Sequence, residues 1–440
     1  MTTDLLTGPR EASPNRKAGR TVAPRIHGLR CRNCSRPEPL GPSYVCAACF
    51  GPLEVAYDYD VVAETFGRET VAARRPGLWR YLELLPVDAP PARGLAVGST
   101  PLIAAARLGP EIGIDNLWLK DDTRNPTLSF KDRAVAVAAA RAAEWKLPAL
   151  ACASTGNLAG ATAAAAAAIG LPAYVVIPAD LEPAKIDHAL AYGASVIRVN
   201  GTYDDVNRLC LEIADETGWG FVNVNLRPFY AEGSKTLAFE VAEDLGWRLP
   251  DVIVAPIASG ALYTKLAKGI EELVRLGLIE PKPVRFVGGQ AAGCGPVASA
   301  FSDGADDITP VRTPDTIVRS LAIGSPADGR YALEQARASA GSIEAVSDEA
   351  AAHAIRRVAA TEGIFPETAG GVTLAAAAQA RAAGVIRPDD EVVVLLTGNG
   401  LKTPDAPAFG LADRRAERGG PGLADAIAPD LDAFLAWLGD

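Results

Sequence analysis

The chain has 440 residues, of which 49% are hydrophobic and 22% are charged. This is an ordinary globular composition, long enough for two or more domains with a large buried core. The formal net charge of −10 argues against broad binding to nucleic acids or anionic membranes, while a local site for a small anion stays compatible with it.

Residues 1–27 contain basic residues but no apolar segment of the kind found in signal peptides, so they predict a disordered extension. The longest apolar stretch, 158–178, is rich in alanine and is divided by Gly170-Leu171-Pro172 into a helix and a short strand. We therefore expect no membrane span there. The odd total of seven cysteines, with clustered pairs, fits a reducing cytoplasm better than a secreted disulfide scaffold.

Four of the cysteines form two Cys-x-x-Cys pairs in one short segment, Cys31 with Cys34 and Cys46 with Cys49. Four thiolates can close a tetrahedral zinc site, and the metal would stabilise a module too small to have its own core. A ribbon that holds free thiols is the alternative. We predict a zinc-ribbon-like module at 28–56, with a structural metal because all four ligand positions would be filled.

Strand and helix patterns alternate in the rest of the chain after a connecting helical region at 57–91. This alternation predicts an α/β fold with mostly parallel sheets and helices on both faces, whose ligands bind beyond the carboxyl ends of the strands. The predicted strands are 117–120, 149–153, 173–177, 195–199, 220–224, 252–256, 284–288 and 391–396. A last amphipathic helix is predicted at 431–438.

The segment 125–133, Asn-Pro-Thr-Leu-Ser-Phe-Lys-Asp-Arg, is predicted to be a turn that leads into an alanine-rich helix at 134–146, with Ser129 as N-cap. Lys131 then lies in a first helical turn, where exposed amide groups disfavour the ammonium form. The free amine is the form that attacks a carbonyl or abstracts a proton. The alternative for Lys131 is a solvated surface lysine.

Two loops are candidate anion sites because each follows a predicted strand and precedes a helix. The first carries Ser154, Thr155 and Asn157. The second can offer backbone amides to a phosphate from Ala258, Ser259, Gly260, Ala261 and Leu262.

Three further residues are weaker candidates. Arg227 could bind a phosphate or carboxylate through its planar guanidinium, or it could be an ordinary loop arginine. His188 lies near a helix start and is interpreted as a surface or packing residue, and Cys294 is interpreted as a packing cysteine.

The motifs Ser-Phe-Lys-Asp-Arg at 129–133 and Ser-Thr-Gly-Asn at 154–157 resemble those of the pyridoxal-phosphate-dependent enzymes of fold type II, and within them the threonine synthase family. The resemblance covers nearly the whole chain, from the cysteine pairs to Thr-Gly-Asn-Gly-Leu-Lys at 397–402. It implies that Lys131 forms the Schiff base with pyridoxal phosphate and that the loop at 258–262 holds the cofactor phosphate. It also implies that Thr397 faces the ring nitrogen and that Asn157 faces a cofactor oxygen. Ser154, Thr155 and Asn157 would bind the substrate carboxylate.

The activity that the resemblance implies is a lyase of threonine biosynthesis, which converts O-phosphohomoserine and water to threonine and phosphate, in the cytoplasm. The residue after Asn157 is Leu158, where threonine synthases usually carry a small hydroxyl residue. Another type II enzyme, such as cysteate synthase or a threonine/serine dehydratase, is one alternative. A zinc-ribbon binding protein with an inactive fold is another.

The expected organisation has four parts: the extension at 1–27, the cysteine module at 28–56, a two-domain catalytic body at 57–410 and a tail at 411–440. The small domain of the body is expected at roughly 119–235. A homodimer is the expected assembly, because dimers are the commonest oligomers.

Overall fold

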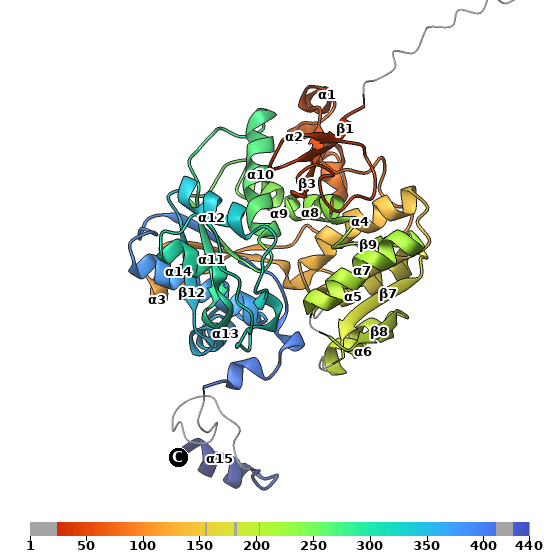
Figure 1. Cartoon of the computed structure of the whole chain (residues 1–440). Helices are drawn as coiled ribbons and strands as arrows, with labels where there is room; N and C mark the ends of the chain where they lie inside the picture. Colours follow the sequence, from red (N-terminus) through yellow and green to blue (C-terminus); the bar gives the residue numbers. More distant parts are fainter. Residues whose placement is uncertain (1–23, 155, 180–182, 202, 411–425, 440) are drawn as a thin grey trace, which may run out of the picture.

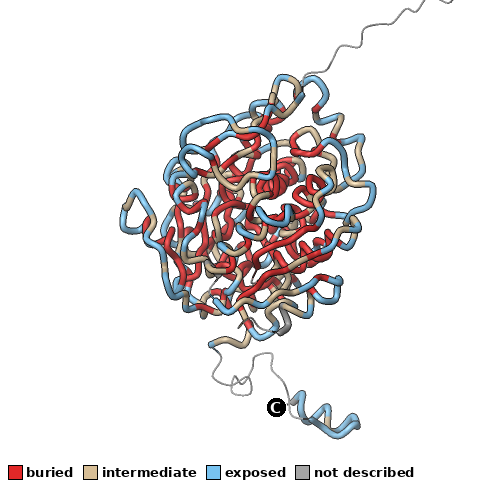
Figure 2. The backbone as a smooth tube through the Cα atoms, turned by 45° about the vertical axis from the view of Figure 1, so that its right-hand side comes forward, coloured by how far each residue is buried: buried red, intermediate tan, exposed pale blue. Residues whose placement is uncertain are grey.

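Three β-sheets organise the part of the chain that the computed structural model describes, residues 24–154, 156–179, 183–201, 203–410 and 426–439 (Figure 1). Two of these sheets form the body, and the third lies in the N-terminal module. Figure 2 shows a buried interior that runs through the body, with exposed segments around it. No helix among the described residues is long and apolar enough to cross a membrane.

The larger sheet has the strand order β12-β11-β10-β13-β5-β4. Its pairs are parallel except for β4 with β5, which is antiparallel. The strands are β4 (Leu102–Ala104), β5 (Asn116–Asp121), β10 (Val252–Pro256), β11 (Arg285–Ala291), β12 (Ser342–Val346) and β13 (Glu391–Leu396).

Helices cover both faces of this larger sheet. Successive side chains of a strand point to opposite faces, so alternate residues of one strand belong to different cores. Along β10, Ile253 and Ala255 belong to the core that contains residues of α9 (Thr236–Asp244) and α10 (Ala261–Arg275). Val252 and Val254 belong to the core that contains residues of α13 and α14. The helices α11 (Pro296–Ser302), α12 (Gly329–Ala338), α13 (Asp348–Glu362) and α14 (Thr368–Ala382) complete this part of the body.

The smaller sheet has the order β8-β7-β6-β9, and all its pairs are parallel. One face packs on α4 and α5, and the other packs on α7. Its elements are α4 (Lys131–Glu144), β6 (Leu150–Ala153), α5 (Asn157–Ile169), β7 (Ala173–Pro178), α6 (Pro183–Ala191), β8 (Ser195–Val199), α7 (Tyr203–Thr217), β9 (Gly220–Phe221) and α8 (Arg227–Ser234).

The predicted α/β fold of mostly parallel sheets flanked by helices is therefore confirmed. Two details were wrong. The strand expected at 220–224 ends at Phe221, where the chain turns. Asn225 holds this turn, because its side-chain amide donates to the carbonyl of Trp219 and its Oδ1 accepts from the amide of Phe221. The short strands β4 and β12 were not predicted, because β4 has three residues and β12 carries charged Glu344 in its middle.

The N-terminal module contains the third sheet, in which β1 (Ile26–Cys31) pairs with β2 (Pro37–Glu38) and β3 (Leu53–Tyr57). The strand β1 starts at Ile26, so its first two residues lie within the segment 1–27 that was predicted as an extension. The short helices α1 (Tyr59–Ala63), α2 (Arg68–Ala72) and η1 (Leu78–Leu84) connect this module to the body, as expected. The helix predicted at 431–438 is α15 (Leu431–Gly439), apart from the body in Figure 1.

Candidate active site

Lys131 is the first residue of α4, so its position in a first helical turn is confirmed. The predicted cap was wrong, because Phe130 is the N-cap residue and the buried hydroxyl of Ser129 makes no hydrogen bond within the described residues. Lys131 Nζ donates to Oη of Tyr230 at 3.0 Å. Nζ lies 4.8 Å from the ring centroid of Phe130 and 5.7 Å from that of Tyr230. The amine is thus held between two aromatic rings rather than exposed to solvent on all sides.

Lys131 faces a cavity, here called the lysine cavity, that lies between the two sheets of the body. Its lining comes from the carboxyl ends of β6, β10 and β13, as the rule for parallel sheets predicts. The predicted site residues on this lining are Lys131, Ser154, Asn157, Ala258, Ser259, Gly260, Ala261, Leu262 and Thr397. Thr155 lies outside the described residues.

The loop between β6 and α5 is fixed by Ser154, whose Oγ accepts hydrogen bonds from the amides of Gly156 at 3.1 Å and Ala159 at 3.0 Å. Asn157 is the first residue of α5, and its Nδ2 donates to both carboxylate oxygens of Glu367 at 2.8 and 2.9 Å. The loop therefore presents a helix N-terminus to the cavity, which suits an anion.

The loop between β10 and α10 presents the first amides of α10 to the cavity, and such amides have no partner within a helix. Gly260 has a φ of +90°, and a Cβ there would lie 2.7 Å from the carbonyl oxygen of Asp328. Only glycine fits this turn, because both the backbone angle and the space exclude a side chain. The amide of Ala261 donates to Oγ of Ser259 over a long distance of 3.5 Å. This geometry suits a phosphate group.

Thr397 directly follows β13, lines the cavity and is 5% exposed. Its carbonyl oxygen accepts the amide hydrogen of Phe130 at 2.9 Å, which joins β13 to the start of the lysine helix. Glu367, at the N-cap of α14, lies beside it, and a Cβ on Gly398 would meet the Glu367 carboxylate at 2.2 Å. Thr397, Asn157 and Glu367 thus form one polar wall.

Arg227 is not among the residues that line the lysine cavity. Its Nη2 donates to Oδ2 of Asp328 at 2.6 Å, and Arg32 of the cysteine module contacts the other oxygen of Asp328 at 3.3 Å. The amide of Asp328 donates to the carbonyl of Ser259 at 2.8 Å. The two arginines therefore support, through Asp328, the loop at 258–262, which is here called the phosphate-type loop.

The polar lining residues Tyr230, Ser234, Ser320 and Glu367 were not singled out from the sequence. The hydroxyls of Ser234 and Ser320 are buried and make no hydrogen bond within the described chain. A partial signal existed for two of them. Tyr230 and Ser234 lie in or just before the Glu-Gly-Ser-Lys-Thr run at 232–236, and the period of a helix places both on one face.

Arg133 anchors the lysine helix from its opposite side. It is fully buried, and its guanidinium donates to Asp122 at 2.8 Å and to Glu240 at 2.7 Å. Glu240 also accepts from Lys120 of β5 at 3.0 Å. Burial would raise the pKa of the Glu240 carboxyl, but Arg133 outweighs it and lowers the pKa to about 2. This network ties α4, on the smaller sheet, to β5 and α9 of the larger one.

The Sγ atoms of Cys31, Cys34, Cys46 and Cys49 all lie within 4.8 Å of one another, and none forms a disulfide. The sulfur atoms of Cys31 and Cys49 are 3.4 Å apart, and those of Cys34 and Cys46 are 3.7 Å apart. Tetrahedral zinc, with bonds of about 2.3 Å to sulfur, holds sulfurs about 3.8 Å apart. The four predicted ligands are thus close enough to one another to bind a single metal ion.

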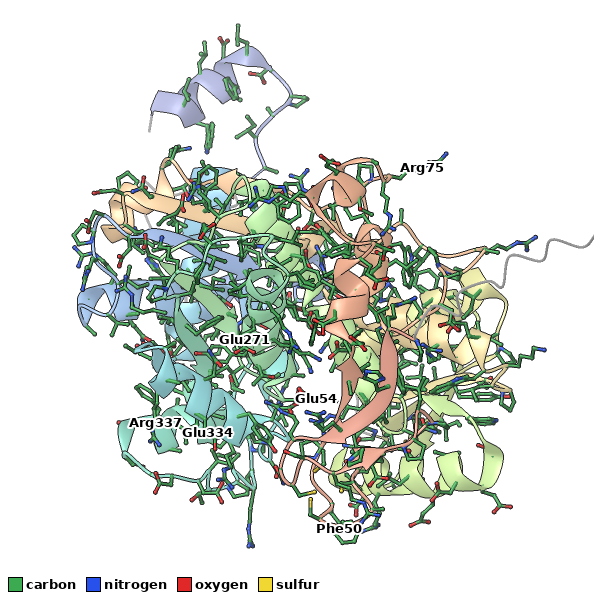
Figure 3. The ribbon with its side chains drawn as sticks, turned by 90° about the horizontal axis from the view of Figure 1, so that it is seen from above. Phe50, Glu54, Arg75, Glu271, Glu334 and Arg337 are labelled. Atoms are coloured by element: carbon green, nitrogen blue, oxygen red, sulfur yellow. The ribbon has the colours of Figure 1, made fainter. Side chains whose placement is uncertain are left out.

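The cysteine module is joined to the body through charged side chains. Glu54 on β3, labelled in Figure 3, accepts from Lys265 Nζ of α10 at 2.6 Å. Burial would raise the pKa of Glu54, but Lys265, Lys268 and Arg32 lower it to about 2. Because α10 begins at the phosphate-type loop, the module rests on the helix that carries this loop.

Comparisons with known proteins agree with this geometry. A family model described as pyridoxal-phosphate dependent enzyme matches residues 94–398, so the chain belongs to that class of enzymes. The threonine synthases of Methanocaldococcus jannaschii and Methanosarcina acetivorans are each 36% identical to it over 86% of this chain and 93% of the relative. The chain is a member of the threonine synthase family.

Solved structures show the fold alone at their level of identity. The processed form of threonine deaminase isoform 2 from Solanum lycopersicum has a TM-score of 0.61 and 18% identity, and the match covers 85% of this chain and 99% of that chain. The predicted fold type and family are thus confirmed.

The residues present fit pyridoxal phosphate. The cofactor requires an amine, a phosphate cradle and a partner for its ring nitrogen. The lysine cavity offers Lys131, the first amides of α10 and Thr397. The buried hydroxyl of Ser234, which lacks a hydrogen-bond partner in the described chain, faces the same cavity. When bound, the cofactor supplies an electron sink for negative charge that develops on the substrate.

Proposed function

We propose that the protein converts O-phosphohomoserine and water to threonine and phosphate, in the cytoplasm. The observation that supports this proposal most directly is the placement of the Lys131 amine. It lies in a cavity that also contains two helix N-termini suited to anions, one at the 258–262 loop and one at Asn157. A phosphorylated amino acid bound beside a phosphorylated cofactor needs such sites.

Each of the site residues would have a separate role in this reaction. The amides of the loop that carries Ser259 and Gly260 hold the cofactor phosphate, and Thr397 faces the ring nitrogen. Ser154, Thr155 and Asn157 orient the substrate carboxylate. Lys131, once displaced by the substrate amine, moves protons at Cα and Cβ of the substrate as base and acid. Phosphate leaves from Cγ, and Cγ gains the proton that Cβ loses and becomes a methyl group. Water adds its hydroxyl at Cβ and its remaining proton goes to the released phosphate, so atoms and charge balance.

Tyr230 has a part in this scheme because its Oη is the hydrogen-bond partner of the Lys131 amine at 3.0 Å. A phenol at this position orients Nζ and can exchange a proton with it, provided that the substrate leaves the contact intact. We propose it as a positioning residue for Lys131. Arg227 takes no direct part, since it is paired with Asp328.

The test compares substrates on the purified holoenzyme. O-phosphohomoserine, O-phosphoserine with sulfite, and L-threonine alone are supplied in separate reactions, and threonine, cysteate, phosphate and oxobutyrate are measured. The proposal predicts turnover of O-phosphohomoserine only. Preferred turnover of O-phosphoserine with sulfite would indicate a cysteate synthase, and preferred deamination of threonine would indicate a dehydratase.

The organisation of the whole protein is proposed on the same basis. Zinc is held by the four cysteines as a structural ion, because no ligand position stays open. The small domain corresponds to roughly 119–235, which contains the smaller sheet, and the remainder of 57–410 forms the large domain. A homodimer is proposed on general grounds alone, because dimers are the commonest assemblies.

A further inference from the structure

The C-terminal helix α15 exposes a row of large apolar side chains. Leu431, Phe434, Leu435 and Leu438 are 68%, 43%, 51% and 63% exposed. Their spacing of three and four residues places them on one face of the helix, here called the apolar stripe. A stripe with this spacing is the pattern by which an amphipathic helix docks into an apolar groove. None of these residues lines the lysine cavity, so the proposed reaction makes no use of them.

The helix α15 is short for a helix that stands apart from the body. It has nine residues, and isolated helices of fewer than about 12 residues are marginal in water. Asp430 supports its start, because the Oδ1 atom accepts the amide hydrogen of Ala433 at 2.8 Å. This local contact favours the helix but leaves the apolar stripe in water. A surface that buries the stripe would stabilise the helix as well.

An apolar groove opens between α3 (Leu108–Ile112), α13 and α14, with a volume of about 190 Å³. It is here called the alanine groove. Its lining includes buried Leu108, Leu374 and Ala375 on the floor, and half-buried Ala350, Ala354 and Ala378 on the rim. An apolar cavity of roughly 150 Å³ is large enough for benzene, so the ring of Phe434 fits this groove. The small rim residues allow a second helix to approach closely.

The chain leaves the body for α15 from the edge of the alanine groove. Arg356 of α13 donates through Nη1 to the carbonyl oxygen of Pro407 at 2.7 Å. A Cβ on Gly410 would lie 3.4 Å from Cγ of Glu349, the residue before Ala350 of the rim. Figure 1 shows α15 below the body, on the side where α13 lies. The segment that leads to α15 therefore starts beside the groove.

The connection is long enough for α15 to reach the groove. About 20 residues separate Gly410 from Leu431, and an extended chain covers about 3.3 Å per residue, roughly 66 Å in all. Because helix and groove belong to one chain, docking is intramolecular, and the tether raises the effective concentration of the helix at the groove. A moderate apolar contact is then sufficient.

The charges of the two surfaces are compatible. Residues 426–439 carry two carboxylates, Asp430 and Asp432, and no cation. Arg357 of α13 lies on the lining of the alanine groove, and no carboxylate of the described chain does. Arg357 also contacts Glu111 of α3 at 2.9 Å, so its charge is already partly paired. Charge therefore favours docking modestly, and the apolar contact supplies most of the stabilisation.

We propose that α15 docks into the alanine groove of its own chain, with the apolar stripe against Ala350, Ala354 and Ala378 and with Asp432 near Arg357. The docked helix covers the helix pair α13–α14. This interaction goes beyond the proposed reaction and does not depend on which substrate the enzyme takes.

The test is amide hydrogen exchange of the full-length holoenzyme, read by mass spectrometry in peptides from 426–439. Leu435→Asp places a charge on the apolar stripe. Ala436→Asp is the matched control, because it places the same charge on the opposite face of the same helix, at another exposed position. Ala354→Asp and Ala378→Asp place the charge in the groove, on α13 and on α14, so that a folding fault in one helix does not decide the result.

We expect exchange in α15 of the wild type to be slowed roughly 10–100-fold relative to an unfolded peptide. Leu435→Asp and both groove variants should abolish this slowing, while Ala436→Asp should keep it within about threefold. The groove variants are the most informative, because their positions are remote from α15 in the sequence. Turnover should stay at the wild-type rate in all four variants, since none of the substituted residues lines the lysine cavity.

Exchange in wild-type α15 as fast as in Leu435→Asp would overturn the proposal. Slowed exchange that persists in both groove variants would also overturn it, because the helix would then dock elsewhere. A mixture of the Leu435→Asp and Ala354→Asp proteins tests docking on a second copy. If the α15 peptide of the Ala354→Asp chain regained its slow exchange there, the helix would dock on the partner, and docking within one chain would be wrong.

Discussion

Lys131 and Arg133 lie two residues apart on α4, yet they face opposite environments. Arg133 is fully buried, and the carboxylates of Asp122 and Glu240 accept from its guanidinium. Lys131 has one neutral partner, Tyr230, and faces cavities where Ser234 and other buried polar groups lack partners. The chain thus supplies ionic partners to Arg133 and a neutral partner to Lys131, which fits a structural role for the first residue and a ligand-binding role for the second.

The comparison shows where the protein holds its own structure together and where it leaves groups for a ligand. A buried polar group that the chain satisfies contributes to a specific fold, whereas an unsatisfied one costs free energy until something binds. The Arg133 network joins the two sheets, and the cavity beside it opens between them. Substitutions in the Arg133 network should therefore change mainly the stability, and substitutions in the lysine cavity should change mainly the activity.

The largest expected effect is on activity. Lys131→Ala removes the proposed Schiff-base amine, which is also the acid–base group, so threonine formation should fall by at least about 10³-fold. The free energy of unfolding of the protein without cofactor should change by less than about 1 kcal/mol, because the hydrogen-bond partner of the amine among the described residues, Tyr230, is neutral. Steady-state rates and urea unfolding check both statements. A variant that keeps a tenth of the activity would remove Lys131 from the mechanism.

The largest expected effect on stability comes from the other side of α4. Arg133→Met removes the guanidinium that the buried carboxylates of Asp122 and Glu240 share, which should lower the free energy of unfolding by about 3–5 kcal/mol. Arg75→Met is the control, since Arg75 is exposed and points away from the body in Figure 3. It should change the free energy by no more than about 0.5 kcal/mol. Equal effects in urea unfolding would contradict the comparison.

The Arg133 network also predicts a pH dependence of stability. The pKa of Glu240 is lowered to about 2 in the folded protein from an ordinary value of 4.5. Its carboxylate therefore stabilises the fold fully above pH 4.5, and this contribution, roughly 3 kcal/mol, is lost as the pH falls through about 2. In urea unfolding between pH 7 and pH 3, Glu240→Gln should have lower stability at pH 7 and a weaker dependence on acid. An unchanged slope would show that Glu240 titrates normally.

The smallest expected effect on catalysis follows removal of the proposed zinc ion. A chelator, or Cys34→Ser, should unfold the cysteine module, because its four thiols converge and the module has little core of its own. Limited proteolysis should then cut within 31–49. Activity should fall by less than about threefold, since none of the described residues of the module lines the lysine cavity. A loss of activity as large as that in Lys131→Ala would place the module in the active site.

Much of the site could be predicted because its motifs are local. The residues of 129–133 and of 154–157 predict loops that lead into helices, and the loops that follow parallel strands meet at one edge of the sheet. The cysteine pairs could be predicted for the same reason, since their spacing alone brings the sulfurs together.

The remaining features depend on contacts between distant segments. Arg133 and Glu240 are 107 residues apart, and nothing in either segment indicates the pairing. Asn157 and Glu367 are 210 residues apart. Lys402 was noted only as part of a motif, and its environment becomes visible when α6 and the 319–320 segment are placed beside it. The Arg227 guanidinium pairs with Asp328, which lies 101 residues away in the sequence, and this pairing could not be predicted from the sequence.

The central claim is that the unpartnered groups around Lys131 serve a phosphorylated amino acid. The most direct test is to incubate the holoenzyme with O-phosphohomoserine and follow threonine and phosphate in the same samples, with Lys131→Ala alongside. The account predicts equal amounts of the two products in the wild type and neither in the variant. A wild-type protein that shows the absorbance of its bound cofactor but releases neither product would contradict it.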